Sequence, residues 1–301
     1  MRLNLNQPAV KRVPRRRLSV GVVVPCHDNS WQLSGILQSL DFQSARPEIV
    51  VVVDDNSNPP QEATLRSLCR THGARYTRLP DPRSQLETLG RRSHARNAGT
   101  RYLQTDIILY LDGDMLLGPG YIEEIKQYHA ALQRIYVRGQ RYCISAAQQG
   151  KGMVSCLTEV KKRPNARETL CSYVTRPKDF VGTRAYQAAH YDRWDWCASN
   201  NLSVRKKHVA LIGYWDEHFV GWGEEDIDFS FRLYRLGLTP IQLVSDNAAS
   251  YHLEHHIDHK TNTFTLRQNG RYLMRKFPDL AEYRKEAYAR YDVNIDDLSR
   301  D

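Results

Sequence analysis

Two carboxylates one residue apart, Asp112 and Asp114, provide the clearest metal chemistry in the chain. They follow an apolar run at 107–111 and precede Gly118-Pro119-Gly120, where the chain turns. Carboxylate oxygens in such a turn suit a hard cation, and we expect Mg²⁺ or Mn²⁺ bridging a diphosphate. Aspartate and glycine are also ordinary turn residues, so the motif alone leaves a solvated turn open.

Four histidines fall within residues 252–259. Neutral imidazole is a common ligand for divalent metals of borderline hardness. His252 and His255 can reach one ion only if the backbone turns after a strand, because residues three apart in a straight strand face opposite sides. A surface histidine cluster is the alternative. We take the lone histidines His129 and His208 as structural.

Trp222 lies between two glycines and directly before a run of acids, namely Glu224, Glu225, Asp226 and Asp228. A helix dipole favours anions in the first turn, and Asp228 can pair with Arg232 four residues later. That account leaves Trp222 unexplained. A tryptophan between glycines suits a platform on which a sugar ring stacks, with a nearby carboxylate that accepts a hydroxyl proton.

A basic segment at 91–99 begins a predicted helix. Guanidinium groups at a helix N-terminus suit phosphate. A solvated helix face explains Arg91 and Arg101 equally well, but it explains Arg96 less well because the small residues Asn-Ala-Gly follow it.

The elements that must position these residues alternate in type along the first half of the chain. Continuous β-branched runs at 18–25 and 48–53 predict strands buried on both faces, and shorter strands are predicted at 75–79 and 107–111. Helical patterns separate them at 31–40, 62–70 and 94–103. This alternation predicts an α/β fold with a doubly wound, mostly parallel, Rossmann-like sheet, whose ligands lie beyond the carboxyl ends of the strands.

The second half of the chain is less regular. The segment 151–191 gives no assignable element. Beyond it we predict helices at 205–212 and 225–236, a strand pair at 241–244 and 249–253, and two helices around Phe277-Pro278.

Composition excludes several classes of protein. The net charge is +9, but six basic residues and no acid lie in the first 18 residues, so nucleic acid is an unlikely partner of the folded body. We expect this tail to make at most weak contact with anionic surfaces. No run approaches the roughly 18 apolar residues of a membrane span. Six scattered cysteines without Cys-x-x-Cys spacing predict reduced thiols and a cytoplasmic protein.

Taken in order, several segments resemble the family 2 glycosyltransferases of GT-A fold: VVVPCHDNSWQLSGILQSL, VVVDDNS, HARNAG, ILYLDGDMLLGPGYIEE and NNLSVRKKHVALIGYWDEHFVGWGEEDIDFSFRLYRLG. The last segment is similar to the C-terminal module of β-1,4-galactosyltransferases, polypeptide N-acetylgalactosaminyltransferases and bacterial chondroitin-type polymerases. The resemblance covers about residues 18–260.

The resemblance implies a role for each candidate residue. Uracil and ribose would contact Pro25, Asp28, Asp54 and Asp55, with Arg96 near the nucleotide. The metal would be held by Asp114 directly, together with Asp112, His252 and His255. The sugar-transfer residues would be Trp222, Glu225 and Asp226, with Asp226 as a catalytic base kept ionised by the helix dipole. At Glu224 the chain departs from the usual glycine, and we expect that side chain to intrude near the sugars.

These inferences predict an inverting glycosyltransferase that uses Mn²⁺ or Mg²⁺ and a UDP-sugar, moving a hexose or N-acetylhexosamine to a glycan, peptide or small-molecule acceptor. The predicted organisation is a basic flexible tail (1–17), a nucleotide-sugar-binding half (18–140), a galactosyltransferase-like acceptor and catalytic half (141–260) and C-terminal helices (261–301). One alternative is a sugar-nucleotide nucleotidyltransferase, although PCHDNS is not its glycine-rich basic loop. Another is a non-catalytic nucleotide-sugar-binding protein.

Overall fold

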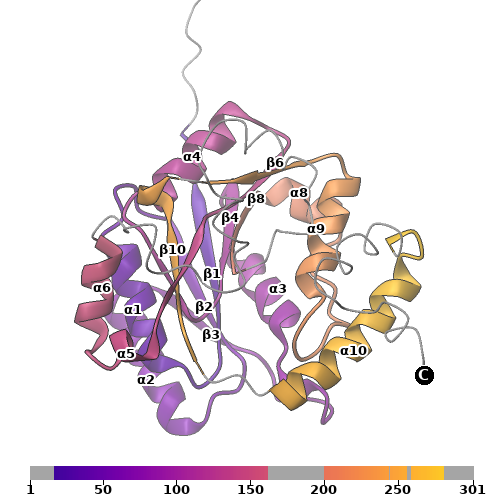
Figure 1. The fold of residues 1–301 in the computed structure, drawn as a ribbon, viewed down its shortest axis with the longest axis horizontal. Helices are drawn as coiled ribbons and strands as arrows, with labels where there is room; N and C mark the ends of the chain where they lie inside the picture. The colour runs from indigo at the N-terminus through magenta and orange to yellow at the C-terminus, as the bar shows by residue number, and fades with distance from the viewer. Residues whose placement is uncertain (1–16, 162–199, 244, 256–258, 281–301) are drawn as a thin grey trace, which may run out of the picture.

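A seven-stranded sheet forms the centre of the molecule, in the order β3-β2-β1-β4-β8-β6-β9 (Figure 1). The computed structural model describes residues 17–161, 200–243, 245–255 and 259–280. Within this sheet only β8 runs antiparallel to its neighbours, β4 and β6. The strands are β1 (Val20–Cys26), β2 (Ile49–Asp54), β3 (Arg75–Arg78), β4 (Ile107–Leu111), β6 (Ile135–Arg138), β8 (Asn201–Arg205) and β9 (Thr239–Gln242). The predicted doubly wound, mostly parallel α/β sheet is confirmed.

The central strands are apolar throughout because both faces of the sheet are covered. In β1, Val22 and Val24 enter one hydrophobic core and Val23 enters the other. In β4, Leu109 and Tyr110 divide in the same way. Side chains alternate across a strand, so a strand covered on both faces needs apolar residues at every position.

Helices fill both sides of the sheet (Figure 1). One core is covered by α1 (Ser30–Asp41), α2 (Pro59–Thr71), α4 (Tyr121–Ala131) and α6 (Met153–Lys161). The other is covered by α3 (Arg92–Tyr102), α8 (Lys206–Leu211), α9 (Glu225–Arg235) and α10 (His259–Lys276). Helix α2 begins earlier than predicted because Asn58 caps it and Pro59-Pro60 fit its first turn.

A second sheet of three strands lies beside the first and corrects one prediction. It consists of β5 (Met115–Leu117), β10 (Ser250–Leu253) and β7 (Arg141–Ile144), with β10 antiparallel to β5 and parallel to β7. The predicted pairing of 241–244 with 249–253 is wrong, since β9 pairs with β6 in the large sheet. Two short strands close in sequence suggest a hairpin, but each finds a distant partner.

Other elements complete the comparison with the sequence. The segment 151–191 contains α6, which follows the short α5 (Ala146–Gln149), while residues 162–199 lie outside the described ranges. Short 3-10 turns lie at Glu87–Leu89 (η1) and Asp246–Ala248 (η4). Helix α10 ends at Lys276, before Phe277-Pro278 as expected, and the second predicted C-terminal helix and the tail 1–16 also fall outside the described ranges.

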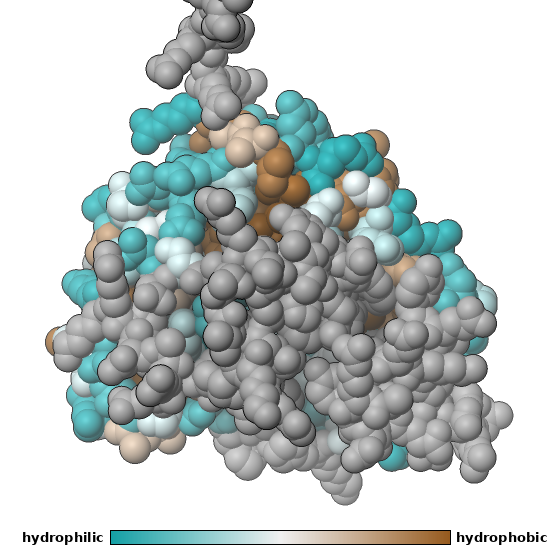
Figure 2. Space-filling view, turned by 45° about the horizontal axis from the view of Figure 1, so that its top comes forward, coloured by the Kyte–Doolittle hydropathy of each residue, from teal (hydrophilic) through white to brown (hydrophobic). Residues whose placement is uncertain are grey.

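The surface and the cysteines bear on two further expectations. None of the described helices combines the length and apolarity that crossing a membrane requires. In Figure 2 the described surface is mostly hydrophilic, with hydrophobic residues gathered near the top of the view. The four cysteines in the described ranges, Cys26, Cys69, Cys143 and Cys156, are buried.

Candidate active site

The carboxylate Asp114 and the imidazoles of His252 and His255 meet at the edge of the small sheet. Strand β10 aligns His252 with Met115, and Leu253 N donates to Asp114 O at 2.9 Å. Because β10 ends at Leu253, the chain turns and brings His255 back toward the same carboxylate. Asp114 Oδ2 lies 3.3 Å from His252 Nε2 and 3.1 Å from His255 Nε2.

These three side chains fit a divalent metal. One ligand atom from each lies within 4.8 Å of the others. The second carboxylate oxygen, Asp114 Oδ1, is buried and has no hydrogen-bond partner among the described residues. Burial by itself would raise the pKa of Asp114, but hydrogen bonds from His252 and His255 outweigh it and lower that pKa. Two imidazoles with one carboxylate suit Mn²⁺ better than Mg²⁺, which prefers oxygen ligands.

Asp112, the first carboxylate of the motif, faces a different partner. Arg96 Nη2 donates to Asp112 Oδ1 at 2.9 Å. Asp112 is not part of the Asp114 cluster, so its role as a metal ligand stays a prediction. The glycine between the two aspartates is required by close packing: a Cβ on Gly113 would lie 2.6 Å from Pro25 O and 2.3 Å from Asn29 Nδ2.

Arg96 connects the metal loop to the acidic turn that starts α9. Its Nη1 lies 3.4 Å from Glu225 Oε1, and its guanidinium carbon lies 4.6 Å from the ring centre of Trp215. Only 1% of Arg96 is exposed. Asn97 holds the backbone of Trp215, since its side chain donates to Trp215 O and accepts from Trp215 N. Burial alone would lower the pKa of Arg96, but Asp112 and Glu225 outweigh it, so the guanidinium stays charged.

The acidic turn itself has an unusual backbone. Glu224, the N-cap of α9, adopts φ 73°, a left-handed conformation that favours glycine. Its side chain is buried and points toward α10, where its Oε1 would lie 3.9 Å from a Cβ on Gly270. Trp222 is 41% exposed, as a stacking platform requires. Asp228, fully buried, pairs with Arg232 as predicted.

Asp226 departs from the expectation that the helix dipole keeps it ionised. Burial, followed by repulsion from Glu225 and Glu224, raises the pKa of Asp226 to about 7, although Arg96 opposes the shift. Its Oδ1 accepts from Ile227 N at 2.9 Å. Burial and the two neighbouring acids therefore outweigh the helix dipole. A carboxylate with a pKa near neutrality is well matched to proton abstraction at neutral pH.

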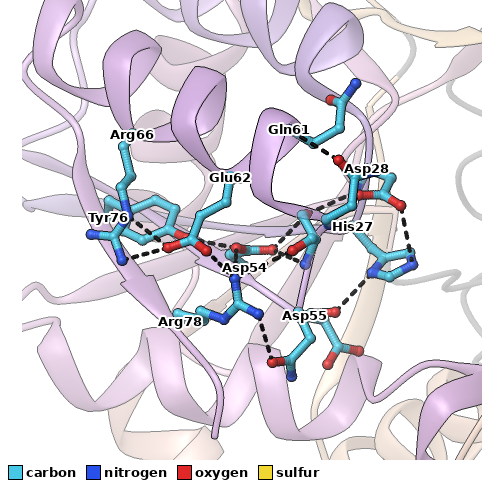
Figure 3. A network of polar contacts seen from close by, with 12 residues as sticks. His27, Asp28, Asp54, Asp55, Gln61, Glu62, Arg66, Tyr76 and Arg78 are labelled. Carbon is cyan, nitrogen blue, oxygen red and sulfur yellow. Dashed lines mark hydrogen bonds and ion pairs between the residues drawn. The ribbon is translucent and has the colours of Figure 1, made fainter. Parts of the chain in front are cut away.

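The carboxyl ends of β1 and β2 carry a dense polar network (Figure 3). Asp54 is fully buried: Oδ1 accepts from Ser57, and Oδ2 accepts from the Tyr76 hydroxyl at 2.6 Å. Asp28, at φ 49°, accepts from Asn58 N through Oδ1 at 2.8 Å. Asp54 therefore supports the loop from behind, whereas Asp28 remains partly exposed at its surface. Their contacts with a nucleotide stay a prediction, as does that of Pro25.

Arg91 forms a buried ion pair with Asp55. A solvated face explained it equally well in the sequence, yet it is only 2% exposed, whereas Arg101 is exposed. Arg91 N donates to Asp55 Oδ2 at 2.7 Å, and Arg91 Nε donates to Asp55 Oδ1 at 2.8 Å. The Asp55 carboxylate thus anchors the start of α3. The next residue, Arg92, donates to Gly221 O at 2.6 Å. This hydrogen bond joins the start of α3 to residues 220–223, here called the Trp222 loop.

Comparison with known proteins identifies the family. Residues 21–194, more than half of the chain, match the family described as glycosyl transferase family 2. The chain belongs to glycosyltransferase family 2. Its fold agrees with this assignment: the S. aureus TarS 1–349 structure, solved in complex with UDP, superposes with a TM-score of 0.55 at 16% identity, over 85% of this chain and 66% of TarS. The fold is therefore GT-A.

This family 2 glycosyltransferase also has curated relatives. Validoxylamine A glucosyltransferase of Streptomyces hygroscopicus subsp. limoneus is 27% identical over 87% of this chain, and the match spans 57% of that relative. The hyaluronan synthase of Pasteurella multocida is 28% identical over 79% of this chain but only 25% of the synthase. The chain thus spans less than two thirds of the length of these relatives.

Two residues of the site escaped sequence reasoning. Thr265 and Asn269 of α10 are almost fully buried and contact the backbone of the Trp222 loop. A signal was present, because Asn269-Gly270 lies inside a predicted helix, where both residue types are unfavourable. Such a pair in a helix interior indicates a tertiary contact.

Proposed function

We propose that this chain catalyses inverting, metal-dependent transfer of a hexose or N-acetylhexosamine from a UDP-sugar to an acceptor. One observation carries the proposal. Buried Arg96 pairs with Asp112 on one side and Glu225 on the other, and so joins the Asp114 metal cluster to the turn that holds Asp226 and Trp222. Arg96 thus holds the proposed leaving-group site and the proposed base in fixed positions. That arrangement suits displacement of the leaving group in a single step.

The donor follows from chemistry and from relatives. The relatives include a glucosyltransferase and hyaluronan and chondroitin synthases, and the TarS structure of the same fold was solved with UDP. These names favour UDP-hexoses and UDP-N-acetylhexosamines. In our proposal the loops at Asp28 and Asp55 receive the nucleoside, and the half at 141–260 faces the acceptor, whose identity is left open.

In the proposed reaction Asp226 accepts the proton of an acceptor hydroxyl while the oxygen of that hydroxyl attacks the anomeric carbon of the donor sugar. The new bond forms as the bond from that carbon to the UDP oxygen breaks, so configuration inverts. Asp114, His252 and His255 would hold Mn²⁺, which neutralises charge on the leaving diphosphate when bound. Arg96 keeps the two carboxylate turns at fixed separation, and Trp222 offers its exposed face to a sugar ring.

Metal dependence is tested by UDP release from UDP-sugars, read as hydrolysis so that no acceptor is needed. EDTA should abolish release and Mn²⁺ should restore it, while His255→Ala should weaken the restoration. His72→Ala is the matched control, because His72 pairs with Asp41 outside the cluster. Full release in EDTA would overturn the metal assignment.

Stereochemistry tests the displacement. NMR of the product formed from an α-linked UDP-sugar should show a β linkage. A retained α linkage would reject Asp226 as the base of a direct displacement.

A further inference from the structure

We infer that Thr265 and Asn269 of α10 are positioning residues for the transfer reaction. They hold the backbone of residues 220–223, which leads directly into Glu224, Glu225 and Asp226. The inference rests on the proposed function for its kinetic consequence, but the contact itself is independent of that function.

Hydrogen bonds from α10 reach four backbone groups of residues 220–223, whereas Gly221 N and Gly221 O pair with Gly90 and Arg92. Asn269 Nδ2 donates to Val220 O at 3.0 Å and to Gly223 O at 2.9 Å, and it lies 3.5 Å from Trp222 O. Thr265 Oγ1 accepts from Trp222 N at 3.0 Å and lies 3.2 Å from Trp222 O. Two side chains one helical turn apart on α10 therefore contact the backbone N–H and C=O of Trp222.

Packing excludes a looser arrangement. A Cβ on Gly221 would lie 2.4 Å from Thr265 Cγ2, and a Cβ on Gly223 would lie 2.6 Å from Leu266 Cδ1. Both glycines also have positive φ, 76° and 99°. The two glycines around Trp222 thus have a stated role: they let the loop lie directly on α10 while the tryptophan ring remains exposed.

We call the contact of Thr265 and Asn269 with residues 220–223 the clamp. The helix that carries the clamp is held in place at its C-terminal end. Lys276 at the end of α10 lies 2.5 Å from both Asp216 Oδ2 and Asp228 Oδ1, and Asp228 belongs to α9. Leu273 is fully buried in the core that α9 also covers. Figure 1 shows α10 alongside α9 at the outer side of the molecule. Helix α10 therefore bridges the loop before α9 and the body of α9.

The burial of Thr265 and Asn269 and the backbone groups that they pair indicate that these contacts hold the loop in place. Thr265 is 2% exposed and Asn269 is 6% exposed. A buried backbone carbonyl without a donor is costly, so these side chains satisfy groups that the positive-φ loop cannot pair by itself. Without them the loop can occupy other conformations, and a small displacement of a reacting group strongly lowers the rate.

The decisive experiment compares Thr265→Val, which keeps the shape and removes the hydroxyl, with Thr265→Ser, which keeps the hydroxyl. Asn269→Ala is a second, independent variant. Gln268→Ala is the matched control, since Gln268 is exposed on the same helix. Two readouts are taken on the full chain: amide hydrogen exchange of a peptide spanning 219–226, and kcat with donor KM in the UDP-release assay.

Thr265→Val and Asn269→Ala should speed exchange in 219–226 and lower kcat roughly 10- to 100-fold, with donor KM nearly unchanged. Exchange in β1 and β4 should stay as in the wild type. Thr265→Ser should retain most of kcat, and Gln268→Ala should match the wild type. Exchange in 219–226 that is equal in wild type, Thr265→Val and Asn269→Ala would overturn the contact, and faster exchange with unchanged kcat would overturn the positioning role. A wild type without turnover on any UDP-sugar contradicts the proposed function instead, and the exchange comparison still decides the contact.

Discussion

At the scale of single residues, one buried arginine organises the site. Arg96 is nearly inaccessible, stacks over Trp215 and pairs with Asp112 and Glu225. A buried guanidinium needs carboxylate partners, because an unpaired buried charge is very costly. Asp226, the third acid of the turn, is not one of the two carboxylates that pair with Arg96, and burial together with repulsion from Glu225 and Glu224 raises its pKa.

Asp226→Asn keeps the shape of the side chain and removes the base. We expect kcat for transfer to fall by roughly 10² to 10⁴-fold, with UDP affinity nearly unchanged in calorimetric titration. Asp279→Asn serves as control, because Asp279 is exposed and pairs with exposed Arg235 at 3.6 Å. A mild effect at Asp226 would assign the base elsewhere.

The dependence of kcat/KM on pH should reflect the raised pKa of Asp226 beside Glu224 and Glu225. With a pKa of about 7, Asp226 accepts protons better as pH rises, so kcat/KM should climb through neutral pH and level off above it. Glu224→Gln removes one of the negative charges that raise this pKa, and the rise should move roughly half a pH unit lower. Glu123→Gln, on exposed α4 surface, should leave the profile in place. An unshifted profile in Glu224→Gln would exclude Glu224 as a contributor.

At the scale of elements, α10 and α9 behave as one unit because charged groups join them. Lys276 meets Asp216 and fully buried Asp228, while Tyr272 donates to Asp216 at 2.9 Å. Burial alone would raise the pKa of Asp216, but hydrogen bonds from Lys276, His218 and Tyr272 outweigh it and lower that pKa. The helix that holds the Trp222 loop is thus fixed at its far end by ion pairs.

Lys276→Met should destabilise the protein by about 3 kcal/mol, because it leaves the Asp228 carboxylate with one cation instead of two in a buried setting. The midpoint of chemical denaturation measures the loss. Arg275→Met removes a neighbouring charge from the exposed side of α10 and should cost less than about 0.5 kcal/mol. Equal losses in the two variants would contradict the anchoring role.

At the scale of the whole molecule, one continuous sheet unites the two predicted halves, since β8 lies between β4 and β6. On the helices that pack against that sheet, burial followed by repulsion from nearby cations lowers the pKa of His129 in α4 to about 3 and the pKa of His208 in α8 to about 4. His129 is fully buried, and its Nε2 lies 3.2 Å from Ser203 Oγ on β8. Neutral histidines in the fold make its stability depend on pH.

Acid should therefore weaken the fold as the pH falls below about 6.5. Unfolded histidine binds a proton below about pH 6.5, whereas folded His129 does not until about pH 3, so unfolding becomes easier across that window. Each such histidine contributes a slope of up to about 1.4 kcal/mol per pH unit. Denaturation at pH 7 and pH 5 should show a smaller pH effect in His129→Gln than in the wild type. His72→Gln, which replaces a histidine paired with Asp41, should not reduce that effect. An equal pH effect in His129→Gln and wild type would show that His129 does not carry it.

Local pattern alone determined a large part of this protein. The β-branched runs at 18–25 and 48–53, separated by helical periodicity, predicted the parallel strands, because alternation and burial act over a few neighbouring residues. The ordered motifs around Asp54, Asp112 and Trp222 were enough to indicate the family. The spacing of His252 and His255 also predicted that both can bind one metal ion only if the chain turns after the strand.

Tertiary structure decided what lies between residues far apart in the chain. The pairing of β10 with β5 brings His252 and His255 to Asp114, across more than a hundred residues, and no local pattern specifies that partner. Burial of Arg91, the raised pKa of Asp226 and the grip of Thr265 and Asn269 on the Trp222 loop likewise arise where separate elements meet. Residue type and spacing encode which groups can react. Their distances and protonation depend on desolvation and on neighbours that only the folded chain supplies.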